Sequence, residues 1–182
     1  LAALGFAIGL ALSGTLSNFA CGVFLMIFRP FRVGDVVATG GITAKVHEIE
    51  LFTTTFDTPD NRRIIVPNNE IFGKTIENIT HHKTRRVDIS VGTAYAADID
   101  RTREVLEQVV RSVEGVQADP APVVYLNELG ASSVNWALRA WAPTPDYWAV
   151  RERLMRTTKV ALDEAGIGIP YPQMDVTIVN RG

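Results

Sequence analysis

The first 28 residues contain no charged side chain, and this segment limits the possible folds more than any other feature. Arg29 and Arg32 follow it, and all 18 basic and 20 acidic residues of the 182-residue chain lie after Phe28. A helix over residues 1–28 would be about 42 Å long at roughly 1.5 Å per residue. Because the apolar core of a bilayer is only about 30 Å thick, such a helix must tilt or bend.

We expect the bend at Gly14. Glycine weakens a helix because its backbone loses more entropy on ordering, and the residues directly after it are polar or β-branched. Beyond the bend, residues 19–28 are expected to lie along the membrane interface. Arg29 and Arg32 then mark the cytoplasmic end by the positive-inside tendency.

Small residues in the first half of this segment recur at helical spacing on two faces. Gly5 and Gly9 form a G-x-x-x-G pair, and Ala3, Ala7 and Ala11 form a second row, two residues out of phase. Small residues let helices approach closely, and two such faces suit a ring of helices, whereas a dimer needs one. The same pattern also fits a buried or membrane helix that forms no pore.

Phe6 and Leu10 are four residues apart and therefore stack on one helical face. In a ring of helices this face could point at the axis. Phe6 and Leu10 would then narrow the hole, and a narrow apolar hole expels water and blocks ions.

Residues 29–82 show the pattern of four or five short strands. VGDVVAT precedes Gly40-Gly41, a hairpin signal, and Thr58-Pro59-Asp60-Asn61 is a turn followed by the strand RRIIVP. Short strands at this spacing predict a small closed β barrel.

From residue 83 the pattern becomes strand, helix, strand, strand, helix, strand. Asp98 is the expected cap of the first helix, and Gly166 is expected to end the second. MDVTIV is the expected last strand. This order is the split βαβ, ferredoxin-like arrangement.

Charge and residue types argue against several other functions. Residues 29–82 carry six basic and seven acidic residues, and 83–182 carry twelve and thirteen, so neither part shows the basic excess of a nucleic-acid binder. Cys21 is the only cysteine, and His81 and His82 would point apart on an extended segment, so no metal site is predicted. No nucleophile has an adjacent base, and we expect neither an enzyme nor a cofactor. The rival function is a membrane-tethered binding or scaffold module.

Five stretches in order resemble the small-conductance mechanosensitive (MscS-like) channel family: GLALSGTLSNFACGV, FRPFRVGDVV, IIVPNNEI, LNELGASS and PYPQMDV. The resemblance implies an α+β membrane protein with four parts. These are a pore-lining and interfacial helix over 1–28, a small Sm-like β barrel over 29–82, a ferredoxin-like α/β domain over 83–170 and a C-terminal strand over 171–182.

The resemblance also implies a function and a location. Members of this family are homoheptamers of the bacterial inner membrane with a cytoplasmic C-terminal domain. Membrane tension opens their pore, which releases ions and small osmolytes during hypo-osmotic shock. The expected partners are therefore further copies of the chain, membrane lipid and the permeating solutes, without nucleic acid.

Site residues follow from the same resemblance. The constricting positions of the family fall on Phe6 and Leu10, and its kink glycine falls on Gly14, with a second glycine at Gly22. The packing positions are Gly5, Ala7, Gly9 and Ala11.

A loop of the family's barrel approaches an asparagine of the interfacial helix, which here gives a predicted contact between Asn69 and Asn18. Phe6 replaces the family's usual leucine, and Asn69 stands where a better-known form of the motif has glycine. The substitution at Phe6 bears on the pore width and on the cost of opening. Because of Asn69, the inactivation behaviour of the better-known members is not carried over to this chain.

Overall fold

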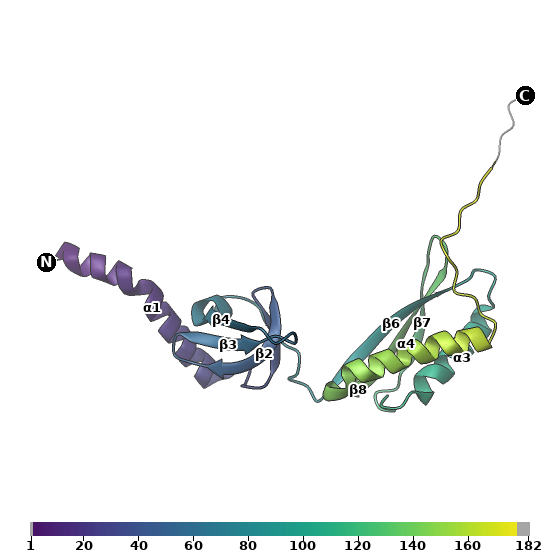
Figure 1. Cartoon of the computed structure of the whole chain (residues 1–182), viewed down its shortest axis with the longest axis horizontal. Coiled ribbons are helices and arrows are strands. Elements are labelled where there is room, and N and C mark those ends of the chain that lie inside the picture. The colour runs from purple at the N-terminus through teal and green to yellow at the C-terminus, as the bar shows by residue number, and fades with distance from the viewer. Residues whose placement is uncertain (1, 178–182) are drawn as a thin grey trace, which may run out of the picture. The chain divides into compact units, whose positions relative to one another are not determined.

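The computed structural model describes the backbone of residues 2–177 and the side chains of residues 9–177. Two compact units make up the chain, residues 1–82 and 83–182 (Figure 1). Each unit has a hydrophobic core built from side chains of its own part of the chain.

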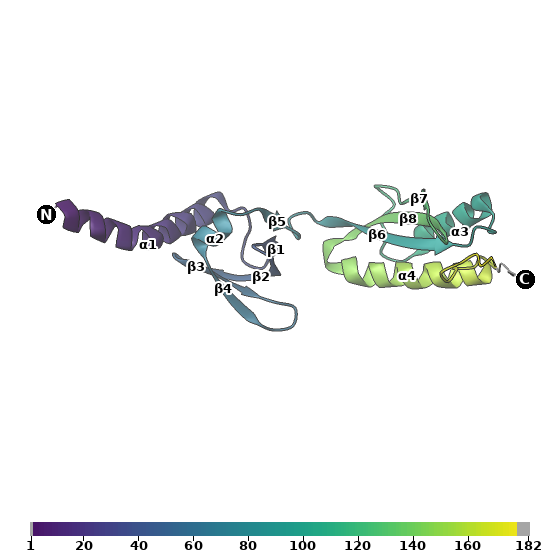
Figure 2. The ribbon, with the colours of Figure 1, turned by 90° about the horizontal axis from the view of Figure 1, so that it is seen from above.

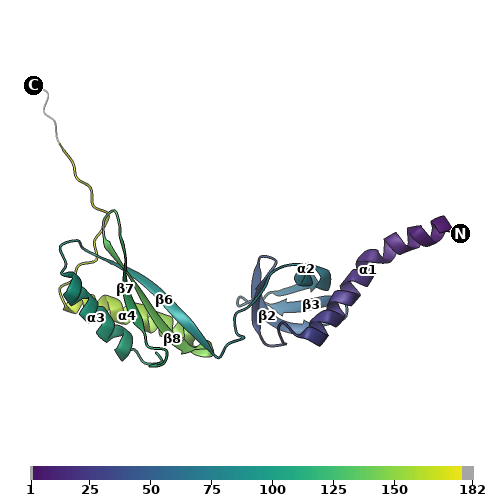
Figure 3. The same cartoon turned by 180° about the vertical axis from the view of Figure 1, so that it is seen from behind.

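The first unit begins with one long helix, α1, which spans Ala2–Phe28. The helix is continuous through Gly14 and Gly22, so the secondary structure has no break at either glycine. The ribbon curves along its length (Figures 1 and 3). A kink localised at Gly14 stays a prediction.

Five short strands and a short helix follow α1 and form the part of the first unit that we call the β domain, residues 29–82. The elements are β1 (Val36–Thr39), β2 (Ile42–Ile49), β3 (Thr53–Asp57), β4 (Arg63–Pro67), α2 (Asn68–Phe72) and β5 (Ile76–Asn78). All neighbouring strands are antiparallel, in the order β4-β3-β2-β1-β5. The expected closed barrel is therefore wrong for the described residues, because β4 and β5 remain the two edges of the sheet.

The predicted Gly40-Gly41 turn connects β1 and β2. Both glycines have positive φ angles, 58° and 86°, and Thr39 pairs with Ile42 across the turn. Two successive positive φ angles match the right-handed twist of the flanking strands, and glycine adopts them without steric cost. The core of the unit joins this sheet to both helices, through Leu25, Phe31, Val37, Ala44, Val46, Phe56 and Ile71.

The second unit packs two helices on one face of a three-stranded sheet. Its elements are β6 (Thr84–Thr93), α3 (Ile99–Ser112), β7 (Val123–Leu129), β8 (Val134–Pro143), a 3-10 turn at Thr144–Asp146 and α4 (Tyr147–Glu164). The strand order is β6-β8-β7. Residues along β8 alternate between buried and half-buried, and α4 runs along the buried face (Figure 2).

The C-terminal strand expected over 171–182 is not a strand in residues 171–177, and residues 178–182 lie outside the described part of the chain. Its apolar side chains Tyr171, Met174 and Val176 are exposed. This segment has no strand partner in the described chain, and a strand needs one for its backbone hydrogen bonds.

Both predicted caps of the second unit are confirmed. The Asp98 side chain accepts a hydrogen bond from Arg101 N at 2.8 Å, which satisfies one of the free N–H groups at the start of α3. Gly166 follows α4 with a φ of 70°, a conformation that ends the helix.

A surface ion pair of the β domain gives a testable pH dependence. Asp57 accepts hydrogen bonds from Arg63 at 2.9 and 3.2 Å, and these bonds lower the pKa of Asp57 below its ordinary value. The pair's contribution to stability is thus present above the ordinary carboxyl pKa and is lost as pH falls through the lowered one. We predict that Arg63→Gln raises the pKa of Asp57 in an NMR titration and leaves Asp60 unchanged. An unaltered Asp57 titration would contradict this cause.

A buried hydrogen bond in the second unit gives a stability prediction. Trp136 Nε1 donates to Thr93 Oγ1 at 3.0 Å, and both side chains are buried. Thr93→Val leaves the indole N–H unpaired and should lower the free energy of unfolding by about 1–3 kcal/mol. Thr93→Ser keeps the hydroxyl and should lower the free energy of unfolding by less. Denaturant unfolding followed by tryptophan fluorescence measures this unit alone, because all three tryptophans lie in it. Equal losses in the two variants would show that the hydroxyl does not matter.

Candidate functional site: the contact between the apolar helix and the β domain

Partway along its length, α1 changes from having exposed apolar side chains to packing on the β domain. Leu10, Leu12 and Leu16 are 60%, 56% and 66% exposed, whereas Leu25 is completely buried. The stretch Gly9–Phe28 is long and apolar enough to cross a membrane, and few of its side chains are buried, unlike those of a core helix. Residues 9–17 of α1 therefore present an apolar surface that the described part of this chain leaves uncovered.

One asparagine side chain connects the helix to the β domain. Asn69 N donates a hydrogen bond to Asn18 Oδ1 at 3.0 Å, and Asn18 Nδ2 donates to the Gly14 carbonyl at 3.0 Å. Asn69 lies in the first turn of α2, where backbone N–H groups have no partner within the helix. Asn18 thus satisfies a free N–H of α2 and joins the backbone at Gly14 to the β domain.

Gly22 allows the closest approach between the helix and the β domain. A Cβ atom on Gly22 would lie 2.2 Å from the Leu51 carbonyl oxygen and 2.5 Å from Asn68 Nδ2. Only glycine fits at such a distance, because the nearest group is backbone and cannot rotate away. The structure thus gives Gly22 a packing role, and a kink at this residue stays a prediction.

The β2–β3 loop that faces Gly22 is held by Asn68. This fully buried side chain donates to the Glu50 carbonyl at 2.8 Å and accepts from Thr54 Oγ1 at 2.8 Å. Its backbone N donates to the Phe52 carbonyl at 2.9 Å. Sequence reasoning missed Asn68. The available signal was an asparagine directly after Pro67, at the point where a strand ends.

Aromatic pairs lie on either side of this polar contact. Phe19 of α1 packs on Phe52 of the β2–β3 loop with ring centroids 6.0 Å apart. Phe24 packs on Phe72 of α2 at 5.5 Å, and α2 lies beside α1 (Figure 3). The second half of α1 therefore forms one packed assembly with α2 and the β2–β3 loop.

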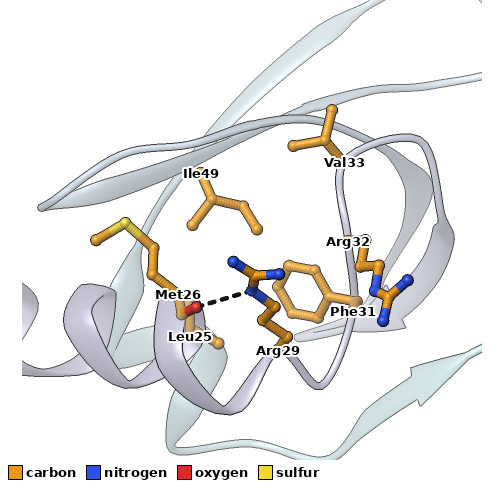
Figure 4. A pocket seen from close by; sticks show the side chains of 7 residues that line it. All are labelled: Leu25, Met26, Arg29, Phe31, Arg32, Val33 and Ile49. Atoms are coloured by element: carbon orange, nitrogen blue, oxygen red, sulfur yellow. Dashed lines mark hydrogen bonds between the residues drawn. The ribbon is translucent and has the colours of Figure 1, made fainter.

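The end of α1 is fixed by an unusual backbone conformation at Arg29. Its φ is 48°, its N donates to the Leu25 carbonyl at 3.0 Å, and its Nε donates to the Met26 carbonyl at 3.2 Å (Figure 4). Pro30 has no N–H with which to continue the helix. The chain therefore turns at Arg29 and inserts Phe31 into the core of the β domain.

The structure brings together some of the predicted site residues and not others. It places Asn18 and Asn69 in contact and sets Gly22 against the β domain. Arg29 and Arg32 lie at the end of α1, and Arg32 N donates to Asp35 Oδ2 at 2.9 Å. The predicted pore position Leu10, the predicted packing positions Gly9 and Ala11 and the predicted kink residue Gly14 are exposed in the chain. The side chains of Gly5, Phe6 and Ala7 lie outside the described residues.

These features define a membrane-associated α+β protein whose apolar helix is docked on a β domain. Residues 14–81 match the family described as mechanosensitive ion channel, beta-domain, and residues 87–169 match mechanosensitive ion channel MscS, C-terminal. The chain belongs to the MscS family of mechanosensitive channels. This family consists of channels rather than enzymes.

Individual relatives agree with this assignment. The small-conductance mechanosensitive channel of Edwardsiella ictaluri is 50% identical over 96% of the chain and 61% of its own length. The closed-state crystal structure of Helicobacter pylori MscS is 31% identical and superposes with a TM-score of 0.95, over 100% of this chain and 72% of that one. Arabidopsis thaliana MSL1, at 19% identity and a TM-score of 0.80 over 93% and 64%, shares the fold. The chain spans about three fifths of the length of the curated relatives it matches first.

We predict that Gly22→Ala separates α1 from the β domain. The added methyl group would overlap the Leu51 carbonyl, and overpacking of this kind costs about 1–3 kcal/mol. Hydrogen exchange at the Asn69 amide, which donates to Asn18, should become faster. Gly9→Ala is the matched control, because it adds the same group to the same helix at a residue where no atom of another segment lies within 4 Å and which takes no part in the contact between Asn18 and Asn69. Similar exchange in both variants would indicate that Gly22 has no packing role.

Proposed function

We propose that this chain forms the pore-lining and cytoplasmic part of a channel that membrane tension opens to release ions and small osmolytes in hypo-osmotic shock. The observation that carries this proposal is the charge-free helix α1, whose residues 9–17 are exposed and whose second half is docked on the β domain. Its relatives include proteins named small-conductance mechanosensitive channel.

In the proposed assembly, seven copies of α1 surround the pore. The two rows of small residues, Gly5 with Gly9 and Ala7 with Ala11, pack neighbouring helices against each other. The face between these rows, at Phe6 and Leu10, then points at the axis. A narrow apolar ring excludes water at rest and so blocks ions without a moving plug.

The proposed location is the bacterial inner membrane, with the second unit in the cytoplasm. Gly9–Phe28 supports the membrane assignment by its length and composition. Arg29 and Arg32, at the end of the helix, support a cytoplasmic position for residues 33–182. Membrane lipid is then the partner of the outer surface of the helix.

The Asn18 side chain couples the pore to the β domain in this proposal. It bonds the Gly14 carbonyl on one side and the Asn69 amide on the other. A bend at Gly14 moves the Gly14 carbonyl relative to Asn18, because a bend changes the spacing between residues one turn apart. Opening and closing at Gly14 thus strains or relaxes the contact with Asn69.

Leu10→Ser should make the closed pore leak and lower the tension at which it opens. The substitution replaces an apolar side chain, worth about 1.5–3 kcal/mol of burial, with a hydroxyl that holds water in the constriction. Leu12→Ser is the matched control, since Leu12 is similarly exposed and lies on another face of the helix. Patch recording of the full-length protein under graded suction measures leak and threshold.

Two results would contradict the proposal. Equal leak and threshold in Leu10→Ser and the unaltered protein would remove Leu10 from the gate. A full-length protein that never conducts under suction would overturn the channel function itself. Particle symmetry in micrographs tests the number of copies independently of conductance.

A further inference from the structure

The sheet of the second unit has one face on which its two helices do not pack. α3 and α4 cover the buried residues of the three strands, such as Val87, Leu138 and Val124. The alternate residues point to the opposite side, because successive side chains of a strand lie on opposite faces. We call this side the open face, and its residues are exposed or half-buried. They include Arg86, Asp88 and Ser90 of β6, Ala137, Arg139 and Trp141 of β8, and Val123 and Tyr125 of β7.

An ion pair on the open face leaves a neighbouring arginine without a partner. Asp88 lies directly opposite Arg139 in the pairing of β6 with β8, where opposite charges would stabilise the sheet. Asp88 instead accepts two hydrogen bonds from Arg86 of its own strand, from Nε at 2.7 Å and from Nη2 at 2.9 Å. No carboxylate among the described side chains forms an ion pair with Arg139. The charge of Arg139 is therefore not neutralised on this face.

The Arg139 guanidinium is positioned by an aromatic ring. Its central carbon lies 5.1 Å from the centre of the Tyr125 ring. Stacking on a ring holds a cation electrostatically but occupies none of the five N–H donors of the guanidinium. Arg139 is half-buried, and charged groups that lose part of their water shell are normally paired. A half-buried arginine with free donors favours an anion as its partner.

The surroundings of Arg139 favour a carboxylate that has an apolar part. The planar fork of one guanidinium matches the two oxygens of one carboxylate. Val123 lies directly opposite Arg139 on β7 and is 40% exposed, and the stacked Tyr125 is 45% exposed. Trp141, two residues further along β8, adds a second aromatic side chain on the same face. Apolar surface next to a single charge matches a small organic acid better than an inorganic anion.

We propose that the open face binds small organic carboxylates, with the carboxylate on the Arg139 guanidinium and the apolar part of the ligand against Tyr125 and Trp141. One guanidinium fork on an open sheet surface makes a weak site, with a dissociation constant in the millimolar range. This binding site goes beyond the proposed function and does not depend on conductance.

The test is a saturation-transfer NMR titration of the full-length protein, observed on the ligand, which suits weak binding to a large particle. The probes are benzoate, its uncharged analogue benzamide, and acetate, which keeps the carboxylate and lacks the ring. We expect benzoate to bind more tightly than either. Arg139→Gln should weaken benzoate binding about tenfold, because charge-assisted hydrogen bonds are lost. Tyr125→Leu should weaken it about threefold, because the ring no longer positions the guanidinium.

The neighbouring ion pair gives two predictions of opposite sign that a merely structural role of Arg139 would not produce. Arg86→Gln releases Asp88 to pair with Arg139, so benzoate binding should weaken although Arg139 is unchanged. Asp88→Asn removes the competing carboxylate, so benzoate binding should tighten. Arg111→Gln is the matched control, because it removes an exposed arginine of α3 that pairs with Glu107, and benzoate binding should not change.

Several outcomes would overturn the proposal. Equal binding of benzoate and benzamide would show that only the ring is recognised. Unchanged benzoate affinity in Arg139→Gln would remove this arginine from the site. Absence of benzoate binding, together with loss of assembly of Arg139→Gln in native mass spectrometry, would show that a carboxylate of a second copy occupies the guanidinium.

The ion-pair variants keep the proposal testable if Arg139→Gln fails to fold. Equal benzoate affinity in Arg86→Gln and Asp88→Asn would then contradict the carboxylate site. Patch recordings measure conductance separately, so each of these outcomes leaves the channel function standing.

Discussion

A helix without charged side chains is unstable when its whole apolar surface is exposed to water. The arrangement of the first unit follows from which parts of that surface are covered and by what. From Asn18 onward the β domain covers one face of the helix, through Leu25 in the core and the pairs of Phe19 with Phe52 and Phe24 with Phe72. Ile27 and Phe28 on the last turn stay exposed. Before Asn18 the described chain provides no cover, and Leu10 and Leu16 stay exposed. The second half of the helix is therefore part of the folded first unit. The residues before Asn18 need a membrane or further copies of the chain to cover their apolar side chains.

Polar contacts decide where the two halves meet. Asn68, fully buried and hydrogen-bonded through both its side-chain oxygen and its nitrogen, holds the β2–β3 loop against Gly22, and a side chain at Gly22 would push the loop away. Asn18 then ties the nearest turn of the helix to α2. A buried amide that lost its partners would cost more than an apolar contact of the same size, so these contacts fix one register between helix and domain. These contacts tie the part of α1 from Asn18 onward to the β domain.

The two units differ in how much of each could be predicted. In the second unit the helix signals are local: they are the helical periodicity, the cap at Asp98 and the helix end at Gly166. The structure has α3 and α4 at the positions that these signals predict. The strand expected in MDVTIV failed over the residues that the structure describes, because alternation of apolar residues gives strand propensity but supplies no partner. The closed barrel failed for a related reason: closure depends on whether β4 and β5 meet, and no local pattern encodes that distance.

The sequence by itself determined the uncharged helix, its small-residue rows, the Gly40-Gly41 hairpin and the membership of the MscS family, since each depends on residue type and spacing alone. The resemblance also pointed to Asn18 and Asn69. Only the tertiary structure showed that Gly22 is a packing position, that Asn68 supports the loop facing it, and that Arg139 stacks on Tyr125. The physical reason is that these roles arise between segments far apart along the chain, such as Asn18 with Asn69 and Gly22 with Asn68. Contacts at that separation depend on how the strands pair and where the helix docks, which spacing along one segment does not specify.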